Sequence, residues 1–209
     1  IKKVNLINIA NIANIFVGYN LRFHPIVVNS LKLIKGKKIT FFSAECHSNL
    51  EKWRKRDLQD TYSSKKKFGG GVEYELSHEI DLLFLFAVEI KSINKLNKKI
   101  STFKSDINDI LLANGKINSN SYFNLSLSLF SQIEKRSFFI VGDDWTLHGD
   151  FLSNELKFKK KSRVIYFKKF SDYKKDTSYL NQHTNILKER YTDLCNLKQY
   201  MKILKFIKK

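Results

Sequence analysis

Cysteine, proline and methionine are almost absent from this sequence of 209 residues, which holds two, one and one of them. Cys46 and Cys195 form no C-x-x-C pair, and the only adjacent Cys and His are Cys46 and His47. This argues against a disulfide framework and favours a reducing compartment, so we expect a cytoplasmic protein. The five histidines are scattered without ligand spacing, and we therefore expect no metal site.

Long apolar runs are also missing, since none reaches the roughly 18 residues that a membrane-spanning helix needs. We expect no membrane segment. Residue 1 is isoleucine and the single methionine is Met201, so we expect sequence upstream of this chain. Residues 1–14 are interpreted as the end of an upstream domain, and 15–209 as one domain, because no repeat or Pro/Ser-rich linker divides it.

Positive charge is in large excess, with 38 Lys and Arg against 20 Asp and Glu. The lysines lie in short runs among Asn, Ile and Phe, which is typical of solvated side chains on loops and strand ends. Charge without a groove-reading motif is weak evidence, so we do not predict nucleic-acid binding. A preference for an anionic small-molecule ligand remains compatible with the excess.

Hydrophobic spacing predicts an α+β domain with an open, mainly antiparallel sheet and flanking helices. Helices are expected over 2–13, 26–34, 72–84 and about 178–208. Strands are expected over 15–20, 39–45, 88–93, 107–113, 117–129, 137–141, 146–151 and 164–170. Residues 47–71 are expected to form a long surface loop, and Asn114-Gly115 is a strong hairpin-turn signal.

The stretch from Lys66 to Phe86 is the most informative, because three glycines precede a helical pattern. One apolar stripe is formed by Val72, Leu76, Ile80, Leu83 and Phe84. Tyr74, His78 and Asp81 lie on roughly the opposite side, with Glu75 one turn before His78. We therefore expect one helix whose core face leaves a titratable face free.

Two further apolar patterns bear on assembly and packing. Apolar residues alternate along one predicted strand at Phe123, Leu125, Leu127 and Leu129. They could form either an exposed sheet face for a homodimer or an interior face under the helices. A stripe on the last helix is formed by Leu194, Leu197, Met201, Leu204 and Ile207.

Three phrases carry a resemblance to a known family: VGYNLRFHP at 17–25, WRKRDLQDTYSSKKKFGGGVEYELSHEIDLL at 53–83 and FFIVGDDWTLHGDF at 138–151. In order and spacing they resemble the C-terminal domain of the Gfo/Idh/MocA oxidoreductases, the glucose-fructose oxidoreductase and inositol dehydrogenase group. The resemblance implies a dehydrogenase acting on a sugar, sugar derivative or polyol, with NAD or NADP held mainly by an N-terminal Rossmann domain. It also implies a homo-oligomer formed through the sheet face.

The resemblance assigns acid/base catalysis to His78, because an imidazole takes up a proton near neutral pH. The alternative is a histidine that caps or packs in the helix. The family often has an aspartate three or four residues before this histidine, and Glu75, with a longer side chain, lies three before His78. By this resemblance Glu75 would orient His78 or hold a substrate hydroxyl. Asp81 matches the aspartate of H-x-x-D and would bind a hydroxyl or position the imidazole; solvated or helix-pairing carboxylates are the alternatives.

Arg22 matches a position near the interdomain cleft of the family. Trp53 and Arg54 match a W-R found in a loop near the substrate in part of the family, and Tyr74 shares the side of His78. Arginine suits a carboxylate or phosphate, and tryptophan offers a flat face to a sugar ring. The alternatives are a surface salt bridge for Arg22 and a core anchor for Trp53.

No nucleotide-binding motif is present, because Gly69 to Gly71 are not part of a G-x-G-x-x-G turn and no Walker-type lysine follows them. The cofactor-binding residues are therefore expected outside these 209 residues, and the chain alone is expected to be inactive. The competing interpretation is a truncated, non-enzymatic ligand-binding or assembly domain that has lost its nucleotide domain.

Overall fold

The computed structural model describes residues 14–53, 57–87 and 89–208. Eight strands form the main sheet: β2 (Phe41–Asn49), β3 (Ser92–Lys98), β4 (Ile110–Asn118), β5 (Ser121–Ser128), β6 (Phe130–Val141), β7 (Trp145–Asp150), β8 (Glu155–Lys160) and β9 (Arg163–Lys169). Their order is β3-β4-β5-β2-β6-β7-β8-β9, and every neighbouring pair is antiparallel except β2 and β5. The predicted α+β class with a mainly antiparallel sheet is confirmed.

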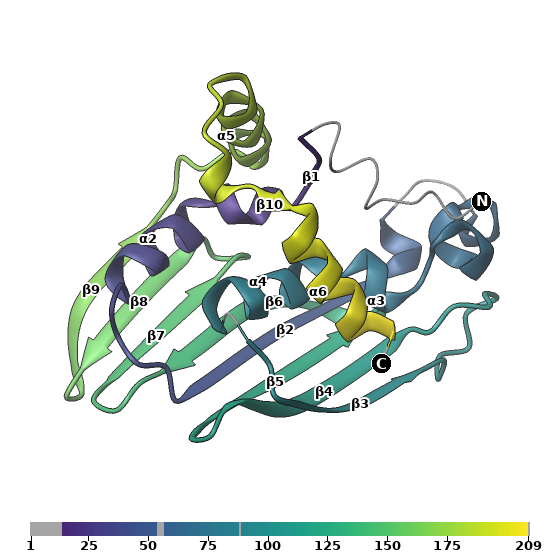
Figure 1. Cartoon of the computed structure of the whole chain (residues 1–209). Helices are drawn as coiled ribbons and strands as arrows, with labels where there is room; N and C mark the ends of the chain where they lie inside the picture. Colours follow the sequence, from purple (N-terminus) through teal and green to yellow (C-terminus); the bar gives the residue numbers. More distant parts are fainter. Residues whose placement is uncertain (1–13, 54–56, 88, 209) are drawn as a thin grey trace.

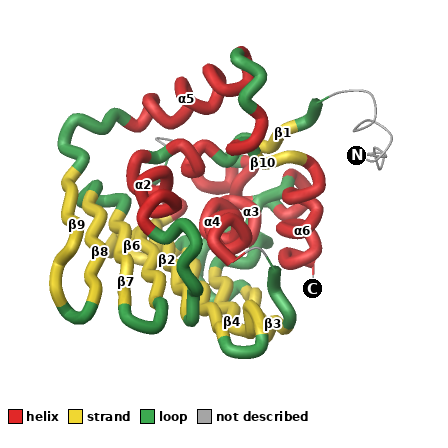
Figure 2. The backbone as a smooth tube through the Cα atoms, turned by 60° about the vertical axis from the view of Figure 1, so that its left-hand side comes forward, coloured by secondary structure: helices red, strands yellow, loops and turns green. Residues whose placement is uncertain are grey.

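Helices cover one face of this sheet (Figures 1 and 2). They are α2 (Pro25–Leu33), α3 (Val72–Glu75), α4 (Ser77–Ala87) and α6 (Leu197–Lys208), whereas α5 (Lys175–Leu187) packs against the 3-10 helix η1 (Asn20–Phe23). Two short strands, β1 (Phe16–Val17) and β10 (Cys195–Asn196), pair antiparallel in a separate sheet. Segments from the two ends of the described chain therefore meet above the helical layer (Figure 1).

The core lies between the sheet and the helices. Phe123, Leu125, Leu127 and Leu129 on β5 and just after it are all at most 1% exposed, so they lie in the interior under the helices. The interpretation of these four residues as a homodimer face is wrong. The opposite sheet face carries other apolar side chains, including Leu112, Tyr122 and Phe139, which are about 40–50% exposed.

The predicted hairpin turn at Asn114-Gly115 is wrong, because both residues lie inside β4 and pair with β3 and β5. A Cβ atom on Gly115 would lie 1.9 Å from the backbone oxygen of Ser92 on β3. Glycine is therefore needed here for close approach of two strands and not for a turn. The turn itself falls at 119–120, between β4 and β5.

Several element boundaries differ from the predictions. The strand expected over 15–20 is only β1, because the chain turns into the 3-10 helix η1 (Asn20–Phe23) before α2. The strand expected over 88–93 begins at Ser92, and β8 was missed. The loop 47–71 holds the end of β2 and short 3-10 turns, η2 (Leu50–Lys52), η3 (Leu58–Asp60), η4 (Tyr62–Ser64) and η5 (Lys66–Phe68).

The single C-terminal helix expected from about 178 is wrong. Residues 188–196 separate α5 from α6 and contain η6 (Tyr191–Asp193) and β10. Glu189 has a φ of 53°, a left-handed conformation that ends α5. The predicted stripe is confirmed in part: Leu194 and Ile207 are buried, but Met201 is 43% exposed, and the buried face of α6 also includes Ile203 and Phe206.

The single central helix predicted over 72–84 is broken at Leu76, where φ is −109° and ψ is 30°. Its apolar stripe is confirmed, since Val72, Leu76, Ile80 and Leu83 are at most 3% exposed. The opposite side of α4 is not free, however, because η1 and α6 lie against it and Asp81 is 1% exposed. The helix predicted over 2–13 and the domain boundary near residue 14 fall almost wholly outside the described residues.

Candidate functional site

The glycine corner shapes the entry to the central helices. Gly69 and Gly71 have φ values of 86° and 133°, which L side chains rarely adopt. A Cβ on Gly70 would lie 2.3 Å from the backbone oxygen of Ser63. The three glycines thus allow a tight turn against η4 before α3 begins.

His78 lies in the first turn of α4, half-buried against Tyr19. The two rings meet edge to face with centroids 5.3 Å apart. Its Nδ1 is buried and makes no hydrogen bond to any described residue. Burial, with a smaller contribution from the charge of Arg136, lowers the pKa of His78 to about 3. The imidazole is therefore neutral at physiological pH and has a lone pair to accept a proton.

Arg136 and Glu79 form an ion pair beside His78. Arg136 Nε donates to Glu79 Oε1 at 2.7 Å, with side-chain exposures of 28% and 1%. The other carboxylate oxygen of Glu79, Oε2, is buried without a hydrogen-bond partner among the described residues. Burial by itself would lower the pKa of the Arg136 guanidinium. The neighbouring Glu79 and Cys46 outweigh that effect, so the pKa is raised.

A second buried imidazole, His24, stands near Arg136 at the junction of η1 and α2. Its ring contacts Phe151 and Tyr173 at centroid distances of 5.0 and 4.1 Å. His24 Nδ1 accepts a hydrogen bond from Ile26 N at 3.2 Å and so caps α2. Burial, followed by the charge of Arg136, lowers the pKa of His24 to about 4.

Arg22 and Asp81 are paired with each other. Arg22 Nε donates to Asp81 Oδ2 at 2.9 Å and Nη2 donates to Oδ1 at 2.6 Å, with both side chains at most 4% exposed. Arg22 Nη1 donates to Gln199 Oε1 on α6 at 2.9 Å. The alternative of a surface salt bridge for Arg22 is wrong, because this pair is buried and joins η1, α4 and α6.

The remaining predicted site residues that the structure describes do not form one cluster with this group. Tyr74 is 40% exposed on α3, and Glu75 is half-buried at the end of α3. The break at Leu76 separates both from the helix that carries His78. Trp53 is half-buried and donates from Nε1 to Ser48 Oγ at 2.7 Å, which agrees with a core anchor. Arg54 lies outside the described residues.

The sequence predictions missed Arg136, Glu79 and Tyr19. A signal for Arg136 was present, because Arg136, Phe138 and Ile140 alternate along β6. Phe138 and Ile140 are buried at 1% and 0% exposure, so strand alternation places Arg136 on the same helix-covered face. An arginine on that face needs a carboxylate partner, which the sequence alone did not identify.

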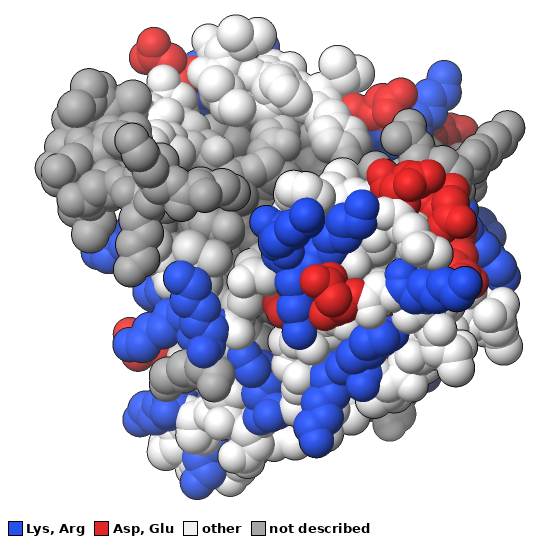
Figure 3. Space-filling view, turned by 90° about the vertical axis from the view of Figure 1, so that its right-hand side faces the viewer, with Lys and Arg blue, Asp and Glu red and all other residues white. Residues whose placement is uncertain are grey.

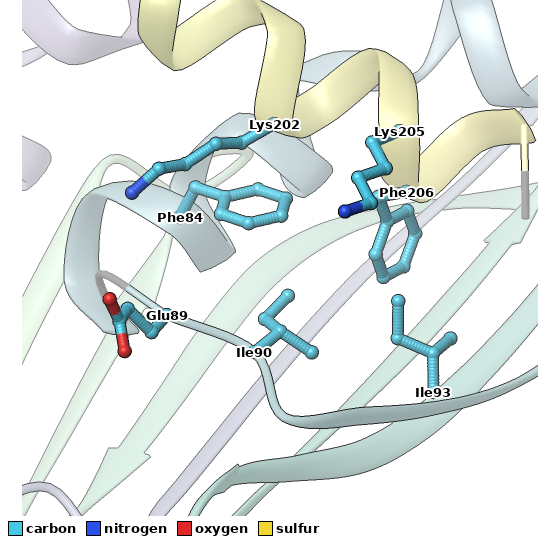
Figure 4. Close-up of a pocket in the computed structure, with 7 residues that line it drawn as sticks. All are labelled: Phe84, Glu89, Ile90, Ile93, Lys202, Lys205 and Phe206. Atoms are coloured by element: carbon cyan, nitrogen blue, oxygen red, sulfur yellow. The ribbon is translucent and has the colours of Figure 1, made fainter.

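Other features of the surface do not compete with this site. A pocket of about 250 Å³ lies between α4, α6 and the chain that leads into β3 (Figure 4). None of the predicted site residues lines it; the lining consists of Phe84, Glu89, Ile90, Ile93, Lys202, Lys205 and Phe206. Figure 3 shows basic side chains in separate groups interrupted by acidic and uncharged ones. Among described residues no His, Cys, Asp and Glu group fits a metal ion, and no helix is long and apolar enough to cross a bilayer.

Acid is expected to destabilise the protein through the two buried histidines. In an unfolded chain their pKa is near 6.5, whereas it is about 4 for His24 and about 3 for His78 in the fold. The unfolded state therefore binds more protons below pH 6.5, and the free energy of unfolding falls as the pH drops toward 4. We expect a loss of roughly 2 to 5 kcal/mol, measured by urea denaturation between about pH 7.5 and 4.5.

His24→Asn is a useful control in this titration, since asparagine also caps helices. We expect this variant to show a shallower pH dependence of the free energy of unfolding than the wild type. Equal slopes for wild type and His24→Asn would show that His24 does not titrate as described.

Comparison with known proteins gives no matching family model and no match among curated proteins. Solved structures do match. UDP-N-acetylglucosamine 3-dehydrogenase GnnA from Acidithiobacillus ferrooxidans is similar with a TM-score of 0.73 and 20% identity, covering 97% of this chain and 62% of that one. Levoglucosan dehydrogenase in complex with NADH and levoglucosan is similar with a TM-score of 0.66 and 15% identity, covering 81% of this chain and 55% of that one.

A homolog of inositol dehydrogenase from Azotobacter vinelandii, complexed with NADH and myo-inositol, gives a TM-score of 0.63 and 12% identity, covering 78% of this chain and 44% of that one. These neighbours are Gfo/Idh/MocA-type dehydrogenases. This chain has the fold of their C-terminal domain. The Gfo/Idh/MocA C-terminal fold predicted from the three sequence phrases is thereby confirmed. The chain spans less than two thirds of the length of the similar structures, 62% for the first of them.

Proposed function

We propose that this chain is the substrate-binding and catalytic half of an NAD(P)-dependent dehydrogenase that oxidises or reduces a sugar, sugar derivative or polyol. The observation that carries the proposal is His78, a neutral imidazole at the start of α4 with one buried nitrogen that has no hydrogen-bond partner among the described residues. The Gfo/Idh/MocA-type fold and the sugar and polyol ligands named with its solved neighbours support the substrate class.

His78 would move the proton of the reacting hydroxyl. When a carbinol is oxidised, hydride leaves the carbon while a proton leaves the oxygen, and a neutral imidazole can take that proton. Because Nδ1 is buried, we assign the exchange to Nε2. Tyr19 packs edge-on against the imidazole and limits its rotation. In the reverse direction, the imidazolium with a pKa of about 3 would be a strong proton donor.

Arg22 and Asp81 act in this proposal as positioning residues. Their buried ion pair fixes η1, which carries Arg22 next to Tyr19, against the α4 helix that carries His78. Asp81 lies one turn after His78 and so holds the same segment of helix. Glu75, Tyr74, Trp53 and Arg54 are retained as the proposed contacts to substrate hydroxyls or to a sugar ring.

NAD or NADP does not fit the described residues of this chain. Their one parallel strand pair, β2 and β5, is not part of a βαβ unit with a glycine-rich turn, and the sequence contains no G-x-G-x-x-G. We therefore place the dinucleotide, which would carry the hydride, on a Rossmann domain outside these 209 residues. We also place homo-oligomer contacts on the sheet face without helices, where Leu112, Tyr122 and Phe139 are exposed.

The test uses the full-length natural polypeptide, purified from its source and sized by intact mass. It is assayed with NAD⁺ and with NADP⁺ against a panel of neutral sugars, sugar acids, sugar phosphates and polyols. We expect reduced nucleotide, seen by its near-ultraviolet absorbance, with at least one member. Absence of turnover across the panel in both directions would favour the second candidate, a non-enzymatic ligand-binding or assembly domain, which the missing dinucleotide motif supports.

The isolated 209-residue chain is the matched control for the cofactor assignment. We expect it to bind dinucleotide poorly and to reduce none. Turnover by this chain alone would overturn the placement of the nucleotide on a separate domain while leaving the role of His78 intact.

A further inference from the structure

Two arginines lie on the helix-covered side of the sheet, and they differ in what their guanidinium groups still offer. Arg22 is 5% exposed and engages both carboxylate oxygens of Asp81 and the amide oxygen of Gln199. It has little capacity left for a ligand. The Arg136 side chain is 28% exposed, and among the described residues its guanidinium donates to one partner, Glu79 Oε1.

The geometry of Arg136 leaves one bidentate edge available. Glu79 occupies Nε, so the edge formed by Nη1 and Nη2 carries no hydrogen bond to a described residue. That edge matches the two oxygens of a carboxylate or phosphate. Glu79 is 1% exposed and holds the plane of the guanidinium from the buried side, while the ring of Phe151 lies 5.9 Å from Arg136 Cζ.

Buried polar atoms around this arginine are also unmatched. Glu79 Oε2 and His78 Nδ1 both lack a hydrogen-bond partner in the part of the chain that the structure describes, although neither atom reaches solvent. Buried polar atoms are normally hydrogen-bonded, so such atoms next to an incompletely used arginine indicate polar groups of a ligand.

We propose that Arg136 binds an anionic group of the substrate, a carboxylate or a phosphate, through its Nη1 and Nη2 edge beside His78. The inference rests on the proposed function, because it names the substrate class of that same site as an acidic sugar or a sugar phosphate. It moves the anion-binding role that the sequence suggested for Arg22 to Arg136, whose Nη1 and Nη2 donate to no described residue.

Such a ligand would also act on His78. The charge of Arg136 helps to keep the pKa of His78 low, and an anion on the guanidinium would offset part of that charge. The charged and titratable groups that the described structure places around His78 and Arg136 are Glu79, neutral His24, Tyr19, Cys46 and Tyr179. The pKa of His78 would therefore rise when the anionic substrate binds, which makes its imidazole a better proton acceptor.

Calorimetry on the full-length polypeptide tests the proposal with four probes: glucuronate, glucose 6-phosphate, glucose and inorganic phosphate. We expect one of the two anionic sugars to bind at least about 10-fold more tightly than glucose, which also distinguishes carboxylate from phosphate. Arg136→Met should weaken that probe by about 10-fold to 100-fold and leave glucose unchanged. Arg136→Lys keeps the positive charge but loses the two parallel donors. Its affinity for the anionic sugar should lie between those of the wild type and Arg136→Met.

Arg163→Met is the matched control, because Arg163 is exposed on β9. It should bind all four probes as the wild type does. Equal affinity of the wild type for glucose and for both anionic sugars would overturn the proposal. So would an Arg136→Met substitution that weakens binding of the anionic sugar no more than it weakens binding of glucose. If only inorganic phosphate depends on Arg136, the proposal is likewise wrong, because the site would not select a sugar.

A measurement on the wild type keeps the test independent of how the variants fold. With ¹³C-labelled histidine, the ring signals of His78 should shift with the anionic probe and stay unchanged with glucose. No shift with either anionic sugar would contradict the proposal. Turnover of an anionic sugar that Arg136→Met leaves intact would refute this inference alone, whereas Arg136-dependent binding without turnover would refute only the proposed dehydrogenase.

Discussion

Replacement of His78 by asparagine is expected to lower kcat of the full-length polypeptide by about 10²-fold to 10⁴-fold with its best substrate. Asparagine keeps a polar side chain of similar reach but cannot take up the proton of the reacting hydroxyl. The rate is measured as reduced nucleotide formed per second, with the far-ultraviolet spectrum used to verify the fold. KM should change much less than kcat, since the lost interaction belongs to the proton transfer.

His148→Asn is the control, because this histidine is exposed on β7 and faces away from the helices. Its kcat should equal that of the wild type. A His78→Asn variant with more than half the wild-type kcat would show that His78 only packs or caps.

The pH profile adds a second reading of the same residue. An ordinary histidine base would cause kcat/KM for oxidation to fall below about pH 6.5. His78, with a pKa near 3 in the free protein, should leave that parameter flat between about pH 8 and 5.5. A fall with a midpoint near 6.5 would mean that another group, or a more exposed His78, takes the proton.

Asp81→Ala is expected to have the largest effect on stability, a loss of about 3 to 5 kcal/mol in the free energy of unfolding. The substitution leaves the Arg22 guanidinium buried at 5% exposure without its carboxylate. Urea denaturation followed by tryptophan fluorescence gives the value. The double variant Arg22→Met with Asp81→Leu should recover most of the loss, because two apolar side chains of similar volume remove the buried charge altogether.

Asp144→Ala is the matched control, since Asp144 pairs with Lys160 at 3.6 Å and both side chains are more than 40% exposed. Breaking this pair should cost at most about 1 kcal/mol. If Asp81→Ala costs no more than Asp144→Ala, the Arg22–Asp81 pair does not hold η1 against α4, and the positioning role assigned to it is wrong.

Periodicity predicted the elements whose burial follows a local repeat. The stripe of Val72, Ile80 and Leu83 is buried as expected, and α2 begins at the proline that closes VGYNLRFHP. Local patterns failed where a distant strand decides the conformation. Gly115 suggested a turn, but the approach of the Ser92 backbone requires a glycine in the middle of a strand.

The candidate site was predicted in part for the same reason. His78 is identified by the motif around it, but its environment depends on partners far away in sequence. Arg22 and Asp81 are 59 residues apart, and Arg136 and Glu79 are 57 apart. Pairs so far apart in sequence are set by the strand order and by how the helices pack on the sheet. The sequence therefore suggested Arg22 as a ligand-binding residue but could not show that Arg22 is bonded to Asp81.

The pairing of β1 with β10 has a consequence for biosynthesis. Phe16 and Val17 cannot pair until Asn196 and Cys195 have been synthesised, and Arg22 cannot bond Gln199 before then, so a late segment of this chain completes a much earlier one. Contacts of such high sequence separation slow folding, and the partly closed chain exposes apolar surface meanwhile. Nascent chains stalled before residue 195 should therefore be held by chaperones and cleared by proteases, even though the whole eight-stranded sheet has already been synthesised.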